Sequence, residues 1–465
     1  MAGDRVRTRR ITIAITERGK YMTALLQRFF QVRKGEGAAV FASALSFFFI
    51  LTALMVIRPA RESLGMRRGI EAVRWLFIGT AVVTLAVNPI FALLVSRYRR
   101  IVFITATYVF FALSLVGFYL VLVGAPTAIG EVSGMVFFVW FSVFNLFSTM
   151  VFWALMADRF SLEQSKRLFG VISVGGTLGA IAGPWLASKL AHPLGTAGLL
   201  PVAATLLALA VVAAWIVTRI QTRSADATAD SGAPREVDDR AIIGGSAWEG
   251  FRAALRSPYL LGISAYVLIL TVISTFIYFT RLQMVAALGS DVDMRTSVFA
   301  RIDFYTQVTT LVLQALVTGQ LMKRLGVHLT LALLPAMVLF GFVGLAISAS
   351  LAALVVLQAA FSAMQRAIVR PARETLFTVV SREDKYKSKA FIDTFVYRVG
   401  DVVGSQLEGL LRGLAMGLAG LVAVTVPLAI VWGALGIWLG RAQQQRVGDG
   451  PTPVRVPRRE EAVVL

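Results

Sequence analysis

Residues 37–62 read GAAVFASALSFFFILTALMVIRPARE, and their composition already indicates the class of protein. No charged side chain occurs between Gly37 and Ile57. An apolar stretch of this length crosses the roughly 30 Å hydrocarbon core of a bilayer as an α-helix, which satisfies its own backbone hydrogen bonds where no water is present. The stretch therefore predicts a membrane-spanning helix with a charged end.

Apolar stretches of similar length recur along the 465 residues, of which 57% are hydrophobic and 15% charged. The first six predicted spans are 37–61, 72–95, 101–123, 134–157, 168–190 and 196–218. The second six are 258–280, 298–321, 326–348, 351–369, 391–411 and 414–438. Six spans, a polar linker and six more spans resemble the major facilitator fold. We therefore expect an all-α membrane protein of twelve transmembrane helices in two six-helix halves.

The predicted spans divide the chain into five parts. These are a cytoplasmic N-terminal segment (1–36) with an amphipathic helix at 21–33, the N-terminal half (37–218), a cytoplasmic linker (219–257), the C-terminal half (258–438) and a cytoplasmic tail (439–465). Lys and Arg concentrate on one side of the spans, so the positive-inside rule places both termini in the cytoplasm. The same rule explains the net charge of +20, and we expect no nucleic-acid partner. The prediction is a monomeric, multi-pass protein of the inner (plasma) membrane, in contact with the lipid bilayer.

The sequence also argues against several kinds of chemistry. It has no cysteine, which excludes disulfides and thiolate metal sites. It has only two histidines, which lie far apart, so a histidine metal site is not expected. No phosphate-binding loop, catalytic triad or dinucleotide motif occurs. We therefore expect no enzyme activity, no cofactor and no metal, and we expect gradients to drive any transport.

The pentapeptide RPARE occurs twice, at 58–62 and at 370–374, each time at the end of an apolar span. These are the first and the tenth spans, which occupy equivalent places in the three-helix repeats of the major facilitator fold. Neighbouring repeats of that fold are inverted, which agrees with a first span that runs outward and a tenth that runs inward. The repeated pentapeptide therefore indicates internal symmetry.

The predicted eleventh span carries polar side chains at helical spacing. They follow one another in steps of three or four residues: Thr394, Arg398, Asp401, Ser405, Glu408 and Arg412. This spacing places them on one face of a helix. Charges that face lipid are costly, so this face either lines a watery cavity or forms ion pairs inside the bundle, for example between Arg398 and Asp401.

Arginine dominates the other charged residues within or beside the spans. These residues are Arg58, Arg61, Glu62, Asp158, Arg281, Arg301, Asp303, Arg366, Arg370 and Arg373. A guanidinium binds carboxylates and phosphates through parallel hydrogen bonds, so the excess of arginine suits a small anionic substrate. Candidates for proton coupling or gating are Asp303, Asp393, Asp401 and Glu408, because desolvation favours the protonated form of a carboxylate. The spacing alone does not separate substrate binding from coupling.

Glycines repeat at four-residue spacing in the fifth span, at Gly175, Gly179 and Gly183. Small residues let helices approach closely, so the repeat predicts a packing surface. Together with Gly170 and Pro184, the pattern also resembles the antiporter signature of major facilitator exporters. That resemblance implies exchange or export.

Several short motifs resemble the ATP:ADP antiporter family of plastids and intracellular bacteria. They are RPARE at 58–62, FWA at 152–154, KRLFG at 166–170, RPARETLF at 370–377, KYKSKA at 385–390 with the following Ile392 and Asp393, and YRVG at 397–400. Family members read approximately D-P-x-K-E where this chain reads RPARE at 370–374. Arg370 therefore replaces an acidic residue and Arg373 a lysine, and the chain is similar to a divergent bacterial branch of the family.

The resemblance implies nucleotide exchange, with charged residues of the first, fourth and tenth spans bound to the phosphates. The corresponding substrate-binding residues here are Arg58, Arg61, Asp158, Arg370 and Arg373, with Arg398 in the eleventh span. Three functions stay open at this point. The chain is an anion exchanger related to the nucleotide antiporters, a proton-coupled exporter or importer of another small molecule, or a non-transporting membrane scaffold or receptor.

Overall fold

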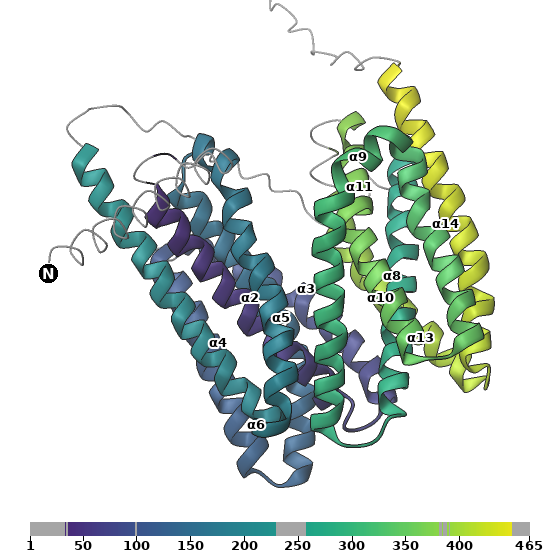
Figure 1. Ribbon diagram of the computed structural model, residues 1–465, viewed down its shortest axis with the longest axis horizontal. Coiled ribbons are helices and arrows are strands. Elements are labelled where there is room, and N and C mark those ends of the chain that lie inside the picture. Colours follow the sequence, from purple (N-terminus) through teal and green to yellow (C-terminus); the bar gives the residue numbers. More distant parts are fainter. Residues whose placement is uncertain are drawn as a thin grey trace, which may run out of the picture. The chain divides into compact units, whose positions relative to one another are not determined.

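The computed structural model describes Arg33 and residues 36–97, 100–228, 257–380, 384, 388–389 and 391–448. The predicted amphipathic helix at 21–33, apart from Arg33, lies outside the described residues, as do most of the linker and the end of the tail. All regular secondary structure in the described part of the chain is helical (Figure 1). The expected all-α class is confirmed for these residues.

The helices follow the predicted spans closely. The first five are α2 (Gly37–Gly65), α3 (Ile70–Arg97), α4 (Arg100–Gly124), α5 (Thr127–Arg159) and α6 (Leu162–Thr228). The next are α8 (Pro258–Ala286), α9 (Val292–Ser348), α10 (Leu351–Met364), the π-helical turn η1 (Gln365–Val369), α11 (Arg370–Leu376) and the short 3-10 turn η2 (Phe377–Val379). The last are a second π-helical turn, η3 (Ile392–Val396), α13 (Tyr397–Gly413) and α14 (Gly417–Gly448).

Two of these helices each join two predicted spans. α6 breaks at Gly195, with φ of 70°, and α9 breaks at Gly326, with φ of 68°. Glycine adopts such left-handed conformations without a steric penalty. With these breaks, a helical segment lies at each of the twelve predicted positions. Nine stretches of the described residues, one of which contains both arms of α6, are long and apolar enough to cross a membrane.

The outward faces of the helices are apolar, as a lipid environment requires. On α4 the exposed side chains include Val109, Phe110, Leu113 and Leu120. Large exposed apolar faces of this kind are unusual on a soluble monomer and are typical of contact with lipid.

Contacts along the chain group it into two compact units. Unit 1 contains Met1–Asp239 and Leu282–Val308, and unit 2 contains Arg240–Arg281 and Thr309–Leu465. The domain boundaries expected from the sequence, at 37–218 and 258–438, stay a prediction. The two units are described separately below.

In unit 1, α6 packs against α2 through the glycine repeat of the fifth span. A side chain on any of the three glycines would collide with the α2 backbone: Gly175 faces the Ala44 carbonyl group, Gly179 the Phe48 carbonyl group and Gly183 the Thr52 carbonyl group. The predicted packing role of these glycines is confirmed.

The same device recurs in unit 2, where α13 packs against α8. A Cβ atom on Gly400 would collide with Thr271, and one on Gly404 would lie 2.9 Å from the Cβ atom of Thr275. In each unit, therefore, two helices that are distant in sequence touch through glycines.

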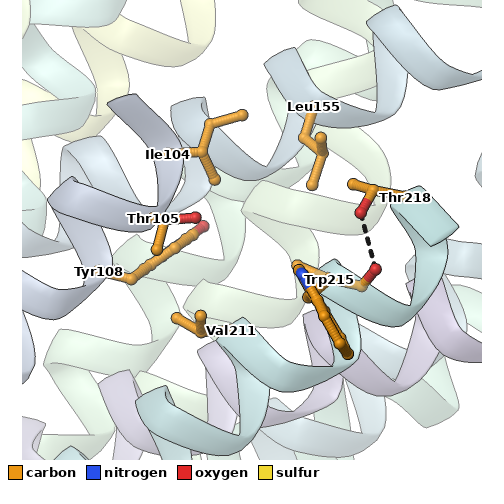
Figure 2. A pocket seen from close by; sticks show the side chains of 8 residues that line it. Ile104, Thr105, Tyr108, Leu155, Val211, Trp215 and Thr218 are labelled. Carbon is orange, nitrogen blue, oxygen red and sulfur yellow. Dashed lines mark hydrogen bonds between the residues drawn. The ribbon is translucent and has the colours of Figure 1, made fainter. Parts of the chain in front are cut away.

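A small apolar cavity of about 20 Å³ lies between α4, α5 and α6 (Figure 2). Its walls include Ile104, Leu155 and Val211, and two of its polar groups are already bonded. Tyr108 Oη donates to the Ser148 carbonyl oxygen at 2.8 Å, and Thr218 Oγ1 donates to the Trp215 carbonyl oxygen at 2.7 Å. A space this small and this apolar does not suit a polar solute.

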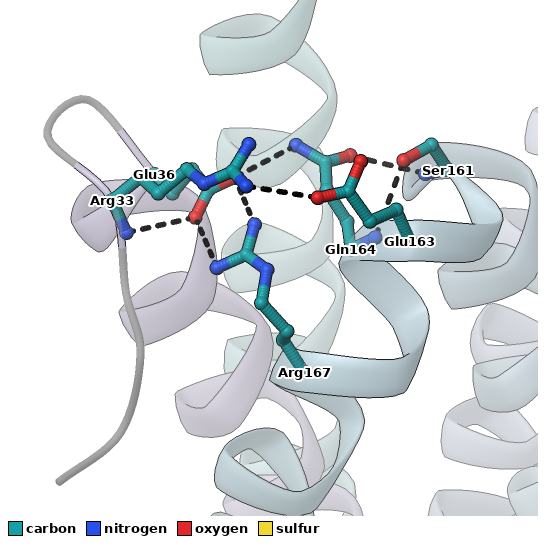
Figure 3. A network of polar contacts seen from close by, with 6 residues as sticks. All are labelled: Arg33, Glu36, Ser161, Glu163, Gln164 and Arg167. Atoms are coloured by element: carbon teal, nitrogen blue, oxygen red, sulfur yellow. Dashed lines mark hydrogen bonds and ion pairs between the residues drawn. The ribbon is translucent and has the colours of Figure 1, made fainter.

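A polar network joins the beginning of α2 to the beginning of α6 (Figure 3). Ser161 and Gln164 cap α6 reciprocally: the Ser161 amide donates to Gln164 Oε1 at 3.0 Å, and the Gln164 amide donates to Ser161 Oγ at 3.3 Å. Glu36 accepts two hydrogen bonds from the Arg167 guanidinium, at 2.9 and 3.2 Å, and one from Gln164 Nε2 at 3.0 Å. Arg33 forms an exposed ion pair with Glu163 at 2.9 Å.

The Glu36 carboxyl is the centre of this network, and its surroundings control its ionisation. Burial raises the pKa of Glu36, but hydrogen bonds from Arg167, the Arg33 amide and Gln164 outweigh burial and hold the pKa below the usual value. The ionised carboxylate is therefore the form that the folded protein favours.

Candidate functional site

Unit 2 contains a cavity of about 420 Å³ whose walls are rich in charge. The residues that line it are Leu270, Gln365, Arg366, Val369, Arg370, Arg373, Asp393, Tyr397, Arg398 and Asp401. They come from α8, from the continuous run α10–η1–α11, and from η3–α13. A cavity of this size is within the range that small-molecule sites occupy in proteins.

Both π-helical turns of unit 2 contribute to this cavity. In η1 the Arg370 amide donates to the Gln365 carbonyl oxygen, and in η3 the Tyr397 amide donates to the Ile392 carbonyl oxygen. These bonds join residues five apart instead of four, the pattern of a π turn, which occurs frequently at functional sites. Pro371 accounts for the first turn, since it lacks the amide that would bond to the Ala367 carbonyl group and its ring crowds that group.

The second π turn changes which side chains face the cavity. In an α-helix Asp393 and Arg398, five residues apart, would point to different sides, whereas a π turn brings residues at this spacing together. Asp393, Arg398 and Asp401 accordingly line the cavity together. Sequence reasoning placed Thr394 on the polar face because it assumed α-helical spacing. Thr394 is not among the residues that line the cavity.

Arg373 is the most enclosed charge of the cavity, with 5% of its surface exposed. It donates from Nη1 to Tyr397 Oη at 2.7 Å, and its Nη2 lies 3.2 Å from Asp393 Oδ1. Its Nε atom is buried and has no hydrogen-bond partner in the described part of the chain. A buried donor without an acceptor is rare in proteins and marks a place where an acceptor is expected.

A second ion pair of the cavity joins Arg398 to Asp401, with Nη1 and Oδ2 3.1 Å apart. Each of these side chains is about one-third or less exposed. Sequence reasoning gave an ion pair between Arg398 and Asp401 as one interpretation of the polar face of the eleventh span. This ion pair is present, and it lies in the wall of the cavity. A flanking pair, Lys389 Nζ with Glu374 Oε2 at 2.5 Å, lies beside Arg373.

The cavity has more positive than negative charge. Four arginines line it against two carboxylates, Asp393 and Asp401. Arg370 is exposed, whereas Arg373 and Arg398 each contact a carboxylate. Guanidinium groups thus outnumber carboxylates in this wall, and planar guanidinium donors of this kind can bind an anion.

Three other predicted site residues belong to unit 1: Arg58 and Arg61 lie in the first RPARE copy on α2, and Asp303 lies on α9. Arg58 Nε lies 3.6 Å from Oδ2 of Asp303, whose side chain is 2% exposed. Arg61 contacts Glu62 Oε1 at 3.1 Å and places its guanidinium 3.6 Å from the centre of the Phe138 ring. These contacts put Arg58, Arg61 and Asp303 in ion pairs of unit 1.

The last two predicted residues lie elsewhere. Asp158 is exposed near the end of α5. Glu408 is buried on α13 and contacts Arg412, with Oε1 3.5 Å from Nε. Neither belongs to the residues that line the cavity of unit 2.

Sequence reasoning did not single out Gln365 or Tyr397 as site residues. Tyr397 stands in the YRVG motif next to a predicted arginine, so that motif was a usable signal. Gln365 lines the cavity because it belongs to the π turn η1, and Pro371 is the only residue in the sequence that indicates this turn. Within the described residues, no cluster of three or more His, Asp or Glu side chains is arranged to hold a metal ion.

Comparison with known proteins adds the family. The family described as Major Facilitator Superfamily matches residues 37–405, more than three quarters of the chain. No curated protein matches the sequence.

Solved structures of transporters share the fold at low sequence identity. One is a bacterial homologue of the human lysosomal transporter Spinster, inward-facing and unoccupied, with 14% identity and a TM-score of 0.53 over 89% of this chain and 99% of that chain. A second is a POT family transporter in complex with 5-aminolevulinic acid, with 11% identity and a TM-score of 0.56 over 90% and 98%. A third is a bacterial homologue of the iron transporter ferroportin, inward-facing, with 12% identity and a TM-score of 0.57 over 88% and 98%. At these identities the likeness concerns the fold alone, and it agrees with the expected major facilitator fold of twelve helices.

Proposed function

Because this chain belongs to the major facilitator superfamily, it is a transporter and not an enzyme, and we propose that it moves a small anion across the inner membrane through the cavity of unit 2. The observation that carries this proposal is the surplus of arginine in the cavity wall. A guanidinium binds carboxylates and phosphates through parallel hydrogen bonds, so a cavity wall in which arginines outnumber carboxylates supports an anionic ligand.

The contacts in the cavity suggest how binding proceeds. An entering anion competes with Asp393 for Arg373 and with Asp401 for Arg398, because each arginine is already within 3.2 Å of its carboxylate. Exchange of one carboxylate for a substrate oxygen keeps the arginines neutralised at each stage. This keeps the free-energy cost of an empty cavity low and allows the carrier to return without cargo or with a second anion.

Nucleotide exchange is the finer form of this proposal. It is supported by the motifs that resemble ATP:ADP antiporters, above all RPARETLF at 370–377, which supplies Arg370 and Arg373 to the cavity. The comparisons with known proteins lead to the superfamily and not to that family, so the nucleotide is a candidate substrate beside other phosphates.

Proton-coupled transport of another small molecule is the second candidate. Asp393 and Asp401 favour it, since both carboxylates line the cavity and each contacts an arginine that would be released by protonation. We also propose that both termini are cytoplasmic and that the protein acts as a monomer, in agreement with the distribution of Lys and Arg.

The test is uptake of labelled phosphate, ADP and ATP into proteoliposomes preloaded with the same unlabelled compounds, with and without a pH gradient. We expect Arg373→Gln and Arg398→Gln to lower uptake by at least tenfold, since removing one partner of a buried charge pair costs roughly 2 kcal/mol or more. Arg441→Gln is the control, because Arg441 is an exposed arginine on α14, outside the cavity wall.

Each outcome decides between the candidates. Uptake that needs internal anion supports exchange, and uptake that follows the pH gradient supports proton coupling. Normal uptake by either arginine variant would contradict the role of the cavity. A folded protein that accumulates none of these anions would favour another solute or a scaffold.

A further inference from the structure

We infer that Gln443 of α14 and Tyr259 of α8 are positioning residues for the cavity of unit 2, because they hold the end of α11 and with it the guanidinium of Arg373. This inference rests on the proposed function, since it assigns a role in anion binding to residues outside the cavity wall. Neither Gln443 nor Tyr259 lines the cavity itself.

The helix α11 depends on its neighbours for its position. It has seven residues and lies between two irregular turns, the π turn η1 before it and the 3-10 turn η2 after it. Pro371 also removes one backbone hydrogen bond where α11 begins. A helix of about two turns between such irregular turns is held only weakly by its own backbone. Contacts with other helices therefore determine where α11 and the arginines on it lie.

Two side chains from other helices bind the carbonyl groups at the end of α11. Tyr259 Oη donates to the Leu376 carbonyl oxygen at 2.9 Å, and Gln443 Nε2 donates to the Thr375 carbonyl oxygen at 2.7 Å. Both side chains are buried. The last carbonyl groups of a helix lack the usual backbone partner four residues further on, so donors from other helices fix the position of the helix end. We call Tyr259 and Gln443 the clasp of α11.

Arg446 adds to the clasp from the same helix as Gln443. The two residues are three apart on α14, so they share a face of that helix. The Arg446 guanidinium lies 4.4 Å from the centre of the Tyr259 ring, within the range of a cation–π contact. One face of α14 therefore contacts both the end of α11 and the aromatic ring that bonds to it.

The clasp affects the cavity because Arg373 belongs to the helix that the clasp holds. The Arg373 guanidinium lies 2.7 Å from Tyr397 Oη and 3.2 Å from Asp393 Oδ1, which belong to α13 and η3. A shift of α11 by about 1 Å would lengthen such contacts beyond the range of a hydrogen bond. Binding groups have to stay within about 0.5 Å of the productive geometry. The clasp therefore keeps this guanidinium in its place in the wall.

The amide oxygen of Gln443 indicates that packing alone does not explain this residue. Gln443 Oε1 is buried and has no hydrogen-bond partner in the part of the chain that the structure describes. A buried polar atom without a partner lowers stability, whereas a methionine of similar length would fill the same space without one. The bond from Nε2 to the Thr375 carbonyl group is therefore the feature that distinguishes glutamine from an apolar residue here.

The experiment measures dissociation constants of the purified, full-length protein for inorganic phosphate, ADP and ATP at constant ionic strength. Gln443→Met removes the donor without a change of charge, and Tyr259→Phe removes the hydroxyl but keeps the ring beside Arg446. We expect each variant to bind the tightest of the three anions roughly tenfold more weakly, the effect of one lost hydrogen bond to a charged group. Gln445→Met is the matched control, because Gln445 is exposed on the same helix. Wild-type affinity in both clasp variants would overturn the inference.

Uptake into proteoliposomes separates positioning from a general loss of structure. A smaller fraction of folded protein lowers the maximal rate, whereas a misplaced binding group raises the half-saturating concentration. We expect Gln443→Met to raise the half-saturating concentration and to keep the maximal rate within about twofold of the wild type. In an Arg373→Gln background the same change should have almost no further effect, because the group that it displaces is already absent. A lowered maximal rate alone, or an undiminished further loss in that background, would contradict positioning.

The outcomes distinguish this inference from the proposed function. If both clasp variants bind the anions as the wild type does and Arg373→Gln removes that binding, the clasp inference is wrong and the anion carrier stands. If a wild-type protein that unfolds cooperatively on heating binds none of the three anions, both are wrong.

Discussion

Glu36 links the start of α2 to α6, and the stability of unit 1 should depend on its charge. Its lowered pKa in the folded protein means that the stabilisation is complete above the ordinary glutamate pKa of about 4.3 and is lost as the pH falls through the lowered value. We expect Glu36→Gln to lower the free energy of unfolding by about 1–3 kcal/mol at pH 7, the range for hydrogen bonds to a charged group.

The measurement is the thermal unfolding of both proteins in detergent from pH 7 downward. The difference between them should shrink at acid pH, because the wild-type carboxyl is then protonated as well. Glu163→Gln is the control, since its pair with Arg33 is exposed and such pairs contribute little. A deficit for Glu36→Gln that is constant at all pH values would show that packing, and not charge, explains it.

The sequence identified several single residues that line the cavity, and physical reasons explain which ones it did not. Arg370, Arg373, Arg398, Asp393 and Asp401 attracted attention because charge within an apolar span is costly and therefore informative. Tyr397 carries no such signal, because a tyrosine at the end of an apolar stretch is ordinary. The ion pairs of Arg58 and Arg61 depend on tertiary contacts that spacing along one helix does not reveal.

At the level of helices, the glycine contacts between α6 and α2 give a sharp prediction. An added methyl group at Gly175 would overlap the Ala44 carbonyl group, whereas Gly170 on the same helix has nothing within 4 Å of its added Cβ atom. We expect Gly175→Ala to destabilise unit 1 by about 1–3 kcal/mol, the usual cost of overpacking, and Gly170→Ala to be neutral or slightly stabilising. Thermal unfolding of the two variants measures this directly.

The same comparison, between a closely packed glycine and a glycine in open space on the same helix, can be made in unit 2. Gly400 faces Thr271 of α8, and Gly413 on the same helix has open space around it. Equal unfolding temperatures for Gly175→Ala and Gly170→Ala, or for Gly400→Ala and Gly413→Ala, would show that the helices can separate slightly at no cost, against the close packing described here.

The π turn η3 gives a second prediction at this scale. A π turn holds one residue more than the equivalent α-helical turn. Deletion of Thr394 should therefore restore an α-helix in which Asp393 and Arg398 are four residues apart and still share a side. We expect this deletion variant to fold and to keep its anion binding within about tenfold of the wild type, as measured by ligand-dependent thermal shift.

The control is deletion of Val403, an exposed residue in the regular part of α13. Here the loss of one residue rotates the remainder of the helix by about 100° and should abolish folding. If both deletions are equally harmful, the extra residue of η3 has a role of its own beyond setting the register.

The positions of the helices were the part of the structure that the sequence predicted best. Apolar length fixes the position of a membrane helix, and each predicted span coincides with a helical segment. The breaks at Gly195 and Gly326 and the π turns were not predicted, since they depend on local backbone geometry. That geometry explains why the predicted polar face of the eleventh span includes Thr394, where the cavity has Asp393.

For the whole molecule, the absence of cysteine makes the orientation directly measurable. Thr127 at the start of α5 is predicted to lie outside, and Glu163 at the start of α6 to lie in the cytoplasm. We expect a membrane-impermeant maleimide to label Thr127→Cys in intact cells, and to label Glu163→Cys only after the membrane is opened. The reverse pattern would place both termini outside.

The whole-molecule architecture was predictable because it follows from the number and order of apolar stretches. The substrate was not predictable from the architecture, because the fold does not determine the function. A homologue of Spinster and a homologue of ferroportin, for example, share this fold. Only the charges of the cavity, brought together from η1, α11, η3 and α13, bear on that question.

The glycine contacts between α6 and α2 also affect how the chain is made. The first helix has its main partner far along the sequence; the Glu36–Arg167 bond, for example, spans 131 residues. At a synthesis rate of 5–20 residues per second, α2 leaves the ribosome roughly 7 to 26 seconds before that partner exists. During this interval the face of α2 that later packs against α6, and its charged end, are accessible to the insertion machinery. Of the described helices, α2 therefore depends longest on that machinery.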